Sequence, residues 1–387
     1  MEKNQYSFPA ILVLGSTGSV GEQALDVAAQ CGIRVRGISA HKNWRRVEEQ
    51  ARAFGVSVVA MTDEGAAREL RAALADTAIT VKSGEAGLLD MIRESDAAFA
   101  VNAILGEAGL LPTLAALESG KDLALANKES LVVAGEIVMR TAKENRRLIT
   151  PVDSEHSAIF QALRSGADRE IKNLILTASG GPFFGKCREE LSHITVDDAL
   201  AHPTWNMGAK ITVDSATLMN KGFEVIEAAH LFGVPADRIK VVVHRESIIH
   251  SMVEYIDNSI IAQMSVPDMR LCVQYALTAP HRTPAVIPPL DLLSVGKLTF
   301  AAPDEETFPF LAAARNALAA GGAAPAALNA ANEVAVSAFL ARKISMLKLF
   351  EVVLSTVADI PHASKAHTLS EILDIDREAR ERAAARL

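Results

Sequence analysis

The first 150 residues alternate short apolar runs with segments that mix apolar and charged residues. The apolar runs are continuous rather than alternating, and they are Ala10–Leu14, Val35–Ser39, Val56–Ala60, Ala97–Ala103 and Leu123–Ala126. Continuous apolar strands are typical of a parallel sheet that helices cover on both faces. Because strands and helices follow one another in turn, this pattern predicts a Rossmann-like, doubly wound α/β domain.

The next block, from Asp153 to Thr278, has a different pattern. Two strands and one helix are expected, at Asn173–Thr177, Lys240–Val243 and Leu218–Phe232. Apolar residues from Ile248 to Met264 are interrupted by Asp257-Asn258, which predicts a β-hairpin with its turn at that pair. We therefore expect a central α+β domain.

A proline-rich segment separates this block from the C-terminal part of the chain. Between Ala279 and Asp304 the prolines are Pro280, Pro284, Pro288, Pro289 and Pro303. Neither a helix nor a central strand tolerates that density, so the segment is expected to be a linker. Beyond it, residues at helical spacing predict a small helical bundle, with helices at Ala324–Arg342, Leu347–Val357 and Leu369–Leu387.

Composition narrows the function classes. The chain has 387 residues, which is enough for two or three domains. Its net charge of -8 gives no electrostatic footprint for nucleic acid or an anionic membrane. The apolar stretch Ala97–Leu117 is broken by polar residues and proline, so it does not predict a membrane span.

The cysteines and the N-terminus bear on localisation. Cys31, Cys187 and Cys272 are far apart and form no C-x-x-C pair, which argues against a disulfide framework and against a structural zinc. We expect thiols in a reducing compartment. The segment Met1–Pro9 is too short and polar for a signal peptide, so a cytoplasmic location is expected.

A glycine-rich loop follows the first expected strand. Gly15, Gly18 and Gly21 are spaced G-x-x-G-x-x-G and precede a helical stretch at Glu22–Ala29. Glycines let the backbone approach a pyrophosphate, and a helix N-terminus supplies unpaired N–H groups. The loop predicts nucleotide binding, with hydroxyl donors from Thr17 and Ser19. On its own the glycine pattern also fits a plain strand-to-helix turn.

The end of the second strand bears on cofactor choice. It reads Ser39-Ala40-His41-Lys42-Asn43 and is followed by Trp44-Arg45-Arg46. A site that prefers NADH usually places an acid here, and this stretch has cations instead. The sequence thus favours NADPH, although a solvated basic turn would look the same. Four parts of the chain follow: an NADPH-binding domain at 1–152, the α+β domain at 153–278, the linker at 279–304 and a helical domain at 305–387.

Candidate metal ligands follow the last strands of the first domain. Asn127-Lys128-Glu129 lies where the strand Leu123–Ala126 ends, at the edge where ligands bind in such sheets. The apolar run Leu148–Val152 leads into Asp153-Ser154-Glu155. In an extended segment Asp153 and Glu155 point the same way, and a Mg2+ or Mn2+ ion between them would relieve their repulsion. Alternatively, the two acids are N-terminal charges of a helix at His156–Leu163.

Two further motifs suggest an anion site. Ser179-Gly180-Gly181 follows an apolar strand and offers a hydroxyl and exposed N–H groups. The second motif runs from Asp214 to Glu224 and leads into a helix. Lys221 and Glu224 share a face of that helix, where Glu224 could complete a metal site. Phosphate could be held by Ser215, Asn220 and Lys221. Each motif also has a plainer interpretation: a simple turn for the first, a surface ion pair for the second, and a loop histidine without a task for His202.

The order of motifs resembles one enzyme family. The strings are GSTGSVG, ANKES, PVDSEHSAIFQ, LTASGGPF, HPTWNMG, TVDSATLMNKG, SIIHSMVEY and PDMR, together with LNAANEVAV in the final helical part. In this order they are characteristic of the 1-deoxy-D-xylulose 5-phosphate reductoisomerase family. The resemblance spans nearly the whole chain, and DSEHSAIFQ with DSATLMNKG is highly specific.

The resemblance implies a reaction and a set of site residues. Members rearrange 1-deoxy-D-xylulose 5-phosphate and reduce the resulting aldehyde with NADPH to 2-C-methyl-D-erythritol 4-phosphate, in the non-mevalonate isoprenoid pathway. The implied ligands of Mg2+ or Mn2+ are Asp153, Glu155 and Glu224. The implied phosphate contacts are Ser179, Ser215, Asn220 and Lys221. The implied contacts to the substrate backbone are Lys128, Ser154, Glu155 and His202.

The resemblance also implies a cofactor site, a moving segment and an assembly. NADPH would lie against Thr17, Gly18, Ser19 and Val20, with its adenosine end near His41, Lys42 and Asn43, and with Asn127, Glu129 and Gly208 completing the site. A mobile flap would run from Ser179 to Gly208, with Trp205 closing over the substrate. Met207 and Met269 match positions near the nicotinamide. Members of the family are homodimers with a small phosphorylated sugar as substrate.

Three positions depart from the family pattern. His41 stands where many relatives have glycine, Glu107 replaces a commonly small residue near the cofactor, and Thr204 stands where asparagine is frequent. None belongs to the implied metal or phosphate set. Two other hypotheses remain for comparison: an NADP-dependent dehydrogenase of a phosphorylated polyol, and a redox sensor that binds NADPH without catalysis.

Overall fold

The computed structural model describes residues 8–205 and 207–387. These form two compact units, which are described separately. The first, called unit 1, holds the chain up to Ser130 together with Val138–Ser157 and Asp268–Pro288. The second, called unit 2, holds Leu131–Ile137, Ala158–Pro267 and Pro289–Leu387. The sequence expectation for Met1–Pro9 falls largely on residues outside the described part of the chain.

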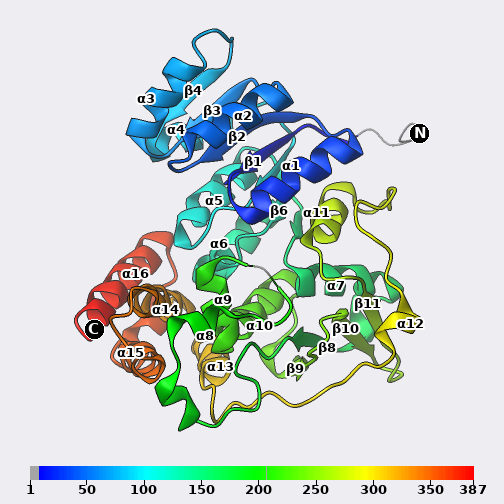
Figure 1. Ribbon diagram of the computed structural model, residues 1–387, viewed down its shortest axis with the longest axis vertical. Coiled ribbons are helices and arrows are strands. Elements are labelled where there is room, and N and C mark those ends of the chain that lie inside the picture. Colours follow the sequence, from blue (N-terminus) through cyan, green and yellow to red (C-terminus); the bar gives the residue numbers. More distant parts are fainter. Residues whose placement is uncertain (1–7, 206) are drawn as a thin grey trace. The chain divides into compact units, whose positions relative to one another are not determined.

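Unit 1 is built on a seven-stranded parallel sheet with the order β4-β3-β2-β1-β5-β6-β7 (Figure 1). The strands are β1 Ile11–Leu14, β2 Val35–Ala40, β3 Val58–Met61, β4 Thr80–Ser83, β5 Phe99–Asn102, β6 Asp122–Leu125 and β7 Ile149–Pro151. The order reverses direction beside β1, whose neighbours are β2 and β5, and ligands bind at such switch points. The predicted doubly wound α/β fold is confirmed.

Helices accompany these strands as the alternating pattern predicts. They are α1 Ser19–Cys31, α2 Trp44–Phe54, α3 Glu64–Ala73, α4 Gly84–Glu94, α5 Leu110–Glu118 and α6 Glu129–Glu144. The helix α11, Met269–Thr278, belongs to the same unit and buries Val273, Ala276 and Leu277 in the core around β1. The hydroxyl of Thr150 on β7 donates to the carbonyl of Ala276 at 3.1 Å, which ties α11 to the sheet.

Unit 2 contains a four-stranded sheet with the order β11-β10-β8-β9. Its strands are β8 Ile171–Ala178, β9 Ile239–Val243, β10 Ile249–Tyr255 and β11 Ile260–Met264. The predicted hairpin is confirmed, because Ile249 pairs with Met264 across it and Asn258 takes a left-handed φ of 67° at the turn. The helices of this part are α7 Ser154–Ala162, whose first turn belongs to unit 1, α8 Val196–Leu200, α9 Ala209–Ala216 and α10 Met219–Phe232.

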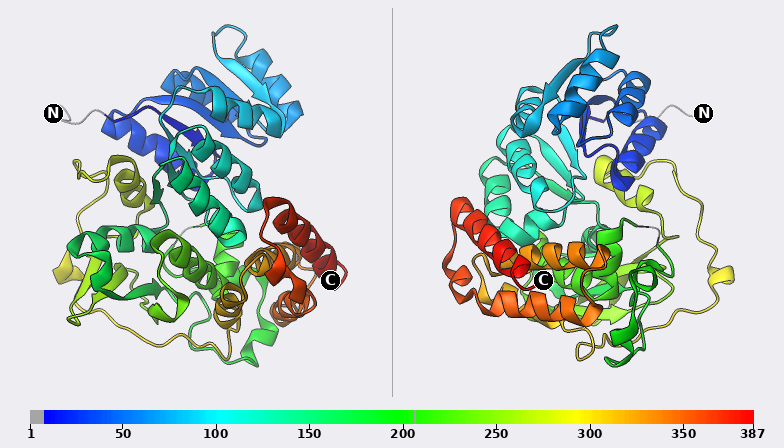
Figure 2. Two further views of the ribbon diagram at one scale, coloured as in Figure 1. Left: turned by 180° about the vertical axis from the view of Figure 1, so that it is seen from behind. Right: turned by 60° about the vertical axis from the view of Figure 1, so that its left-hand side comes forward.

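Four helices of unit 2 form the predicted bundle, drawn from orange to red in Figure 2. They are α13 Phe310–Ala320, α14 Ala324–Leu340, α15 Met346–Ala358 and α16 Leu369–Ala384, whereas the short helix α12 Leu292–Val295 lies in the proline-rich segment. The helix α14 contacts α15 and α16, and α13 contacts α10. Phe310 and Phe350 meet edge to face at 5.0 Å inside the bundle.

Short 3-10 helices connect the larger elements at Glu107–Gly109, Leu163–Ser165, Asp168–Glu170, Glu190–His193, Ala236–Arg238 and Pro361–Lys365. The proline-rich segment is irregular over most of its length, and Ala301 forms an isolated bridge with Val243. Among the described residues, no helix combines the length and the apolar character that crossing a membrane requires.

Candidate active site

The glycine loop connects β1 to α1 in a tightly folded form. Gly15 has a φ of 80°, and a Cβ there would lie 2.7 Å from the carbonyl oxygen of Ala103. A Cβ on Gly21 would lie 2.1 Å from the carbonyl oxygen of Gly15. Both glycines are therefore required for the loop to close. Gly18 is the N-cap of α1, which begins three residues earlier than the predicted Glu22.

The N-terminus of α1 is open to a ligand. Gly18 and Ser19 are exposed, Thr17 and Val20 are half-buried, and no side chain caps the helix. The first N–H groups of a helix have no carbonyl partner within it, and they carry partial positive charge. An anion placed there gains hydrogen bonds and electrostatic stabilisation. The predicted order of strand, glycine loop and helix is present.

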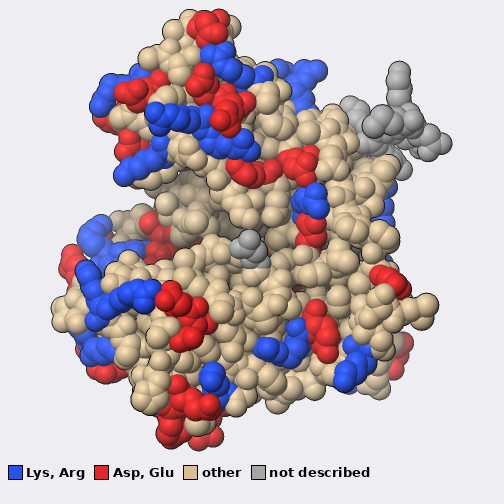
Figure 3. All heavy atoms as spheres, in the orientation of Figure 1, with Lys and Arg blue, Asp and Glu red and all other residues tan. Residues whose placement is uncertain are grey.

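The basic turn after β2 is exposed at His41, Lys42 and Asn43. His41 Nδ1 lies 2.9 Å from Thr62 Oγ1, and the Asn43 side chain caps α2 by accepting from the backbone N–H of Arg46. The guanidinium of Arg46 pairs with Glu22 and with Glu49, each at 2.8 Å. Figure 3 shows Lys and Arg side chains interspersed with Asp and Glu over this unit. The charge of Arg46 is therefore largely compensated within the protein.

Asn127, expected to contact the cofactor, is buried and shapes a loop. Its amide nitrogen donates to the carbonyls of Ile104 at 2.7 Å and Gly106 at 2.8 Å, and its oxygen accepts from the N–H of Ser130 at 2.9 Å. A Cβ on Gly109 would collide with this amide at 2.5 Å. The side chain thus holds the segment after β5, which carries Glu107.

Lys128, the next residue, pairs with Asp153. Its ammonium nitrogen lies 2.7 Å from Asp153 Oδ2, and both side chains are largely buried. Asp153 precedes α7, and the N–H of Ser157 donates to its carbonyl in the first helical hydrogen bond. The pairing places a cation beside one of the two predicted metal carboxylates.

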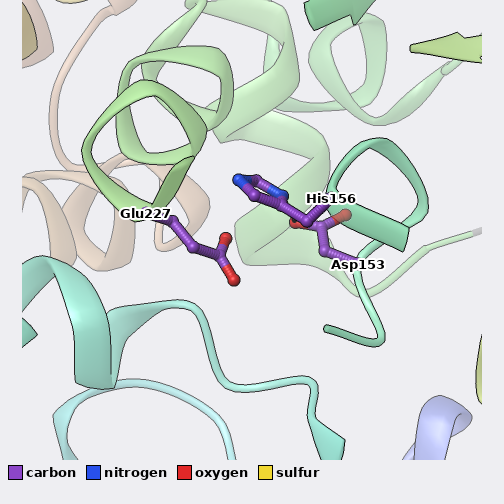
Figure 4. Close-up of side chains that lie close together, drawn as sticks. All are labelled: Asp153, His156 and Glu227. Carbon is purple, nitrogen blue, oxygen red and sulfur yellow. Dashed lines mark ion pairs between the residues drawn. The ribbon is translucent and has the colours of Figure 1, made fainter. Parts of the chain in front are cut away.

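Asp153 and Glu155 do not lie in an extended segment, so that prediction is wrong. The helix α7 begins at Ser154 and puts Glu155 in its first turn, as the alternative interpretation held. Ser154 Oγ donates to Glu155 Oε2 at 2.5 Å. The acids lie at a helix N-terminus, where the helix dipole favours negative charge. Figure 4 shows Asp153 and His156 at this helix, with Nδ1 of His156 3.8 Å from Asp153 Oδ2.

The charges of Asp153 and Glu155 reach a neighbouring thiol. Burial, followed by the negative charges of these two acids, raises the pKa of Cys272 to about 12. Both effects disfavour a thiolate. Cys31 and Cys272 are buried, Cys187 is exposed, and none of the three forms a disulfide.

The Ser179-Gly180-Gly181 turn leaves β8 in a conformation that glycine allows. Gly180 and Gly181 have φ values of 76° and 64°, and a Cβ on Gly181 would lie 2.8 Å from the carbonyl oxygen of Ser215. The N–H of Gly181 donates to Ser179 Oγ at 3.2 Å. The close approach of this turn to Ser215 joins the two motifs that the sequence proposed for an anion.

His202 lies between the two serines. Its Nε2 is 2.9 Å from Ser179 Oγ and 3.2 Å from Ser215 Oγ, while its Nδ1 accepts from the backbone N–H of Trp205 at 3.0 Å. An accepting Nδ1 leaves the hydrogen of the neutral ring on Nε2, which faces the serines. Burial, and then the positive charge of Arg245, lower the pKa of His202. Both ring nitrogens of His202 therefore have hydrogen-bond partners.

The first turn of α10 carries a buried ion pair. Lys221 Nζ contacts Glu224 Oε2, and both side chains are buried, with exposed fractions of 4% and 1%. Asn220 Nδ2 donates to Glu224 Oε1 at 2.6 Å. The alternative of a surface ion pair is therefore wrong. Figure 4 also draws Glu227, which lies one turn beyond Glu224 on the same helix.

The helix α9, which carries Ser215, is anchored to the C-terminal bundle. Asp214 is buried, and its carboxylate accepts from Asn332 of α14 at 2.8 Å and pairs with Lys210 at 3.1 Å. Asn332 lies in the LNAANEVAV string. The bundle thus helps to fix Ser215, a role that the sequence did not reveal.

The chain matches models of one enzyme family along most of its length. A model described as 1-deoxy-D-xylulose 5-phosphate reductoisomerase matches residues 11–135, and two models of its C-terminal domains match residues 149–232 and 264–382. A protein of that name from Caldanaerobacter subterraneus subsp. tengcongensis is 50% identical over 375 residues, covering 96% of this chain and 97% of the relative. The chain belongs to the 1-deoxy-D-xylulose 5-phosphate reductoisomerase family. The resemblance drawn from the motifs is confirmed.

Other relatives and solved structures indicate the same family. The reductoisomerase of Acetivibrio thermocellus is 50% identical over 371 residues, covering 96% of this chain and 97% of the relative. The structure of the reductoisomerase from Zymomonas mobilis in complex with NADPH has a TM-score of 0.91 at 39% identity, covering 98% of this chain and 99% of that one. A DOX-P reductoisomerase in complex with NADPH, fosmidomycin and magnesium has a TM-score of 0.92 at 38% identity, covering 98% of both chains.

The predicted site residues divide between the units. Unit 1 holds the glycine loop, the basic turn, Asn127, Lys128, Glu129, Asp153, Ser154 and Glu155. Unit 2 holds Ser179, His202, Trp205, Gly208, Ser215, Asn220, Lys221 and Glu224. Within unit 1 the structure brings Lys128 and Asp153 together, and within unit 2 it joins Ser179, His202 and Ser215. The predicted flap Ser179–Gly208 includes Asn206, which lies outside the described residues.

Proposed function

We propose that this chain is an NADPH-dependent reductoisomerase that converts 1-deoxy-D-xylulose 5-phosphate to 2-C-methyl-D-erythritol 4-phosphate in isoprenoid biosynthesis, with a divalent metal. One observation carries the proposal: the fold matches, over 98% of its length and with a TM-score of 0.92, a reductoisomerase bound to NADPH, fosmidomycin and magnesium. The helix N-terminus of α1 and the serine–histidine cluster of unit 2 support the same conclusion.

The proposed metal ligands are Asp153, Glu155 and Glu224. Three carboxylates fit Mg2+ or Mn2+, which are hard cations that prefer oxygen ligands. Lys128 beside Asp153 and Lys221 beside Glu224 supply positive charge to the same carboxylates, which fits a cluster that needs cations to stay ionised. When bound, the metal would polarise the oxygens of the substrate as a Lewis acid.

The proposed phosphate site comprises Ser179, Ser215, Asn220 and Lys221. Hydroxyl donors, the N-terminus of the 14-residue helix α10 and the ammonium of Lys221 are groups that bind phosphate. A phosphate held remotely from the reacting carbons provides binding energy for closure of the site. Lys128, Ser154, Glu155 and His202 are proposed to contact the rest of the substrate. His202 would act there as a neutral ring that donates from Nε2.

NADPH is proposed to lie with its pyrophosphate at Thr17, Gly18, Ser19 and Val20, and with its 2′-phosphate near His41, Lys42 and Asn43. Glu129 and Gly208 complete the proposed set. Asn127 is proposed to serve the cofactor indirectly, since its amide nitrogen already binds two carbonyls of the loop at 104–106. The flap from Ser179 to Gly208, with Trp205, would exclude water during hydride transfer, and Met207 and Met269 would lie near the nicotinamide.

The domain roles follow from these assignments. Residues 1–152 would bind NADPH, residues 153–278 would provide catalysis and dimerisation, residues 279–304 would link the domains, and residues 305–387 would support the site.

A homodimer is supported by the edge strand β11, where Ile260 and Ile261 have exposed fractions of 51% and 37%. Light scattering tests the dimer, and Ile261→Lys should weaken it. A cytoplasmic location is supported by three cysteines that form no disulfide, and it is tested by cell fractionation.

The decisive experiment measures NADPH consumption with 1-deoxy-D-xylulose 5-phosphate and added Mg2+ or Mn2+, with the product identified by NMR and mass. Formation of the branched tetrol phosphate supports the proposal. Undiminished turnover after metal chelation would contradict the metal assignment. A product without carbon rearrangement would favour the polyol dehydrogenase, and NADPH binding without turnover would favour the sensor.

A further inference from the structure

Arg245 lies next to the turn that carries Ser179 and contacts its backbone. The pairing of β8 with β9 continues one residue beyond the end of β9, because the N–H of His244 donates to the carbonyl of Ala178, the last residue of β8, at 2.7 Å. Arg245 follows His244 and is thereby held level with the Ser179-Gly180-Gly181 turn. Sequence motifs did not single it out as a site residue.

The side chain of Arg245 fixes two carbonyls of that turn. Its Nη1 donates to the carbonyl oxygen of Ser179 at 3.1 Å and to that of Gly181 at 2.6 Å. The guanidinium carbon also lies 5.1 Å from the centre of the Phe184 ring, in a cation–π contact. One arginine therefore bonds both ends of a turn whose two glycines have left-handed backbone conformations.

This arrangement matters for an anion. Carbonyl oxygens carry partial negative charge and repel phosphate, so their direction decides whether a glycine turn attracts or rejects it. With both carbonyls bound to Arg245, the Ser179 hydroxyl stays beside Nε2 of His202 at 2.9 Å. The guanidinium also adds positive charge close enough to act on the imidazole of His202.

We propose that Arg245 is a positioning residue for phosphate recognition: it fixes the Ser179-Gly180-Gly181 turn so that the Ser179 hydroxyl, held beside His202, is presented to the substrate phosphate. The inference rests on the proposed function for the identity of the substrate. The orientation of the turn toward an anion does not depend on that identity.

The test compares Arg245→Met and Arg245→Gln with a matched control, Arg238→Met. Arg238 makes the same kind of contact at the opposite end of β8, donating to the carbonyls of Ile171 and Lys172. The eight residues of β8 place the two ends about 25 Å apart. Loss of Arg238 therefore perturbs the same strand without reaching the proposed phosphate site.

Two readouts are measured: the Kd for inorganic phosphate, by NMR titration of the metal-loaded enzyme, and the KM values for 1-deoxy-D-xylulose 5-phosphate and NADPH. In the Arg245 variants we expect phosphate affinity to fall and the sugar phosphate KM to rise by about tenfold each, with the NADPH KM unchanged. Arg245→Lys, which keeps the charge, should recover part of the loss. Arg238→Met should leave both phosphate readouts at wild-type values.

A folded Arg245→Met or Arg245→Gln enzyme with wild-type phosphate affinity and KM overturns the inference, and either variant suffices if the other fails to fold. An equal rise of the NADPH KM also overturns it, because it indicates general damage. If wild-type protein does not convert the sugar phosphate, yet phosphate affinity falls in the variants as expected, the inference stands and the proposed function fails.

Discussion

The ammonium nitrogen of Lys128 lies 2.7 Å from Oδ2 of Asp153, and neither side chain is substantially exposed to water. An ion pair in such surroundings is held strongly, because removing one partner leaves the other charge buried. Lys128 thus stands beside a proposed metal ligand and is itself a proposed substrate contact. It can influence both the metal and the reaction, and the two effects are separable by experiment.

Replacing Lys128 with methionine should lower kcat/KM by roughly 100-fold, since a cation near developing negative charge is lost. The affinity for Mn2+, measured by electron paramagnetic resonance, should not fall, because removing a positive charge from the neighbourhood of Asp153 favours the metal ion. Lys82→Met, which breaks an exposed pair with Glu94, is the control. Loss of Mn2+ affinity in Lys128→Met would contradict the expected division of roles.

Replacing Glu224 with glutamine should reduce turnover by roughly 100-fold or more and weaken Mn2+ binding, because one proposed carboxylate ligand is removed. NADPH affinity, measured by fluorescence, should remain within about twofold. Lys221 would lose its buried partner, so the free energy of unfolding should also decrease. Glu351→Gln, which removes an exposed partner of Lys348, should change none of these quantities.

The lowered pKa of His202 predicts a pH dependence of stability. The ordinary value is 6.5, and in the folded protein burial and the charge of Arg245 bring it lower. Just below pH 6.5, His202 becomes protonated in the unfolded chain but stays neutral in the folded chain. The free energy of unfolding therefore decreases as the pH falls from 6.5 toward the lower pKa of the folded protein. Above pH 6.5 the contribution vanishes.

Denaturant unfolding of wild type and His202→Asn at several pH values between 5 and 7.5 measures this effect. The wild-type protein should lose stability more steeply toward acid than the variant. Burial also lowers the pKa of His230, so both proteins should lose some stability toward acid pH for this shared reason. Identical slopes for the two proteins would show that His202 contributes no linkage.

Replacing Gly21 with alanine should weaken NADPH binding by roughly tenfold or more, because its Cβ would lie 2.1 Å from the carbonyl oxygen of Gly15 and force the loop apart. Gly55→Ala is the control. Unlike Gly21, Gly55 has a positive φ, 58°, which strains an alanine there, but a Cβ meets nothing within 4 Å and the residue lies at the C-terminal end of α2, outside the loop. NADPH affinity near wild type in Gly21→Ala would show that the loop does not bind the cofactor.

Replacing Lys42 with glutamine should raise the Kd for NADPH by roughly tenfold while leaving that for NADH unchanged, because the 2′-phosphate would lose a cation. Arg46→Gln is a useful comparison, since Glu22 and Glu49 already compensate that charge. Its effect on the NADPH Kd should be smaller. Equal effects of the two substitutions on NADPH and NADH would argue against selection at this turn.

Most of the fold could be predicted because its strands are buried and its helices are strongly periodic. The strand β4, Thr80–Ser83, was missed because its edge position leaves it partly exposed and its sequence, Thr-Val-Lys-Ser, carries no continuous apolar run. The extended geometry expected at Asp153 and Glu155 failed because a helix N-terminus also favours acids. Sequence spacing cannot distinguish these two environments.

The candidate site was predictable where its residues lie within one motif, as with Lys221 and Glu224 on one face of α10. The contact between Arg245 and Ser179 was not predictable from the sequence. It depends on the pairing of β9 with β8, two strands that are more than 60 residues apart in the sequence. Asn332 was missed for the same reason, since its contact with Asp214 joins distant helices. Such contacts require the folded chain.

The three thiols differ in exposure, so a label can be attached to one of them in the unmodified protein. Cys31 and Cys272 are buried, and the pKa of Cys272 is about 12, so neither should react with a maleimide at neutral pH. Cys187 is exposed and lies within the proposed flap. A fluorophore or spin label should therefore attach at one position of the unmodified chain, and its signal would follow flap closure during turnover without any cysteine being removed.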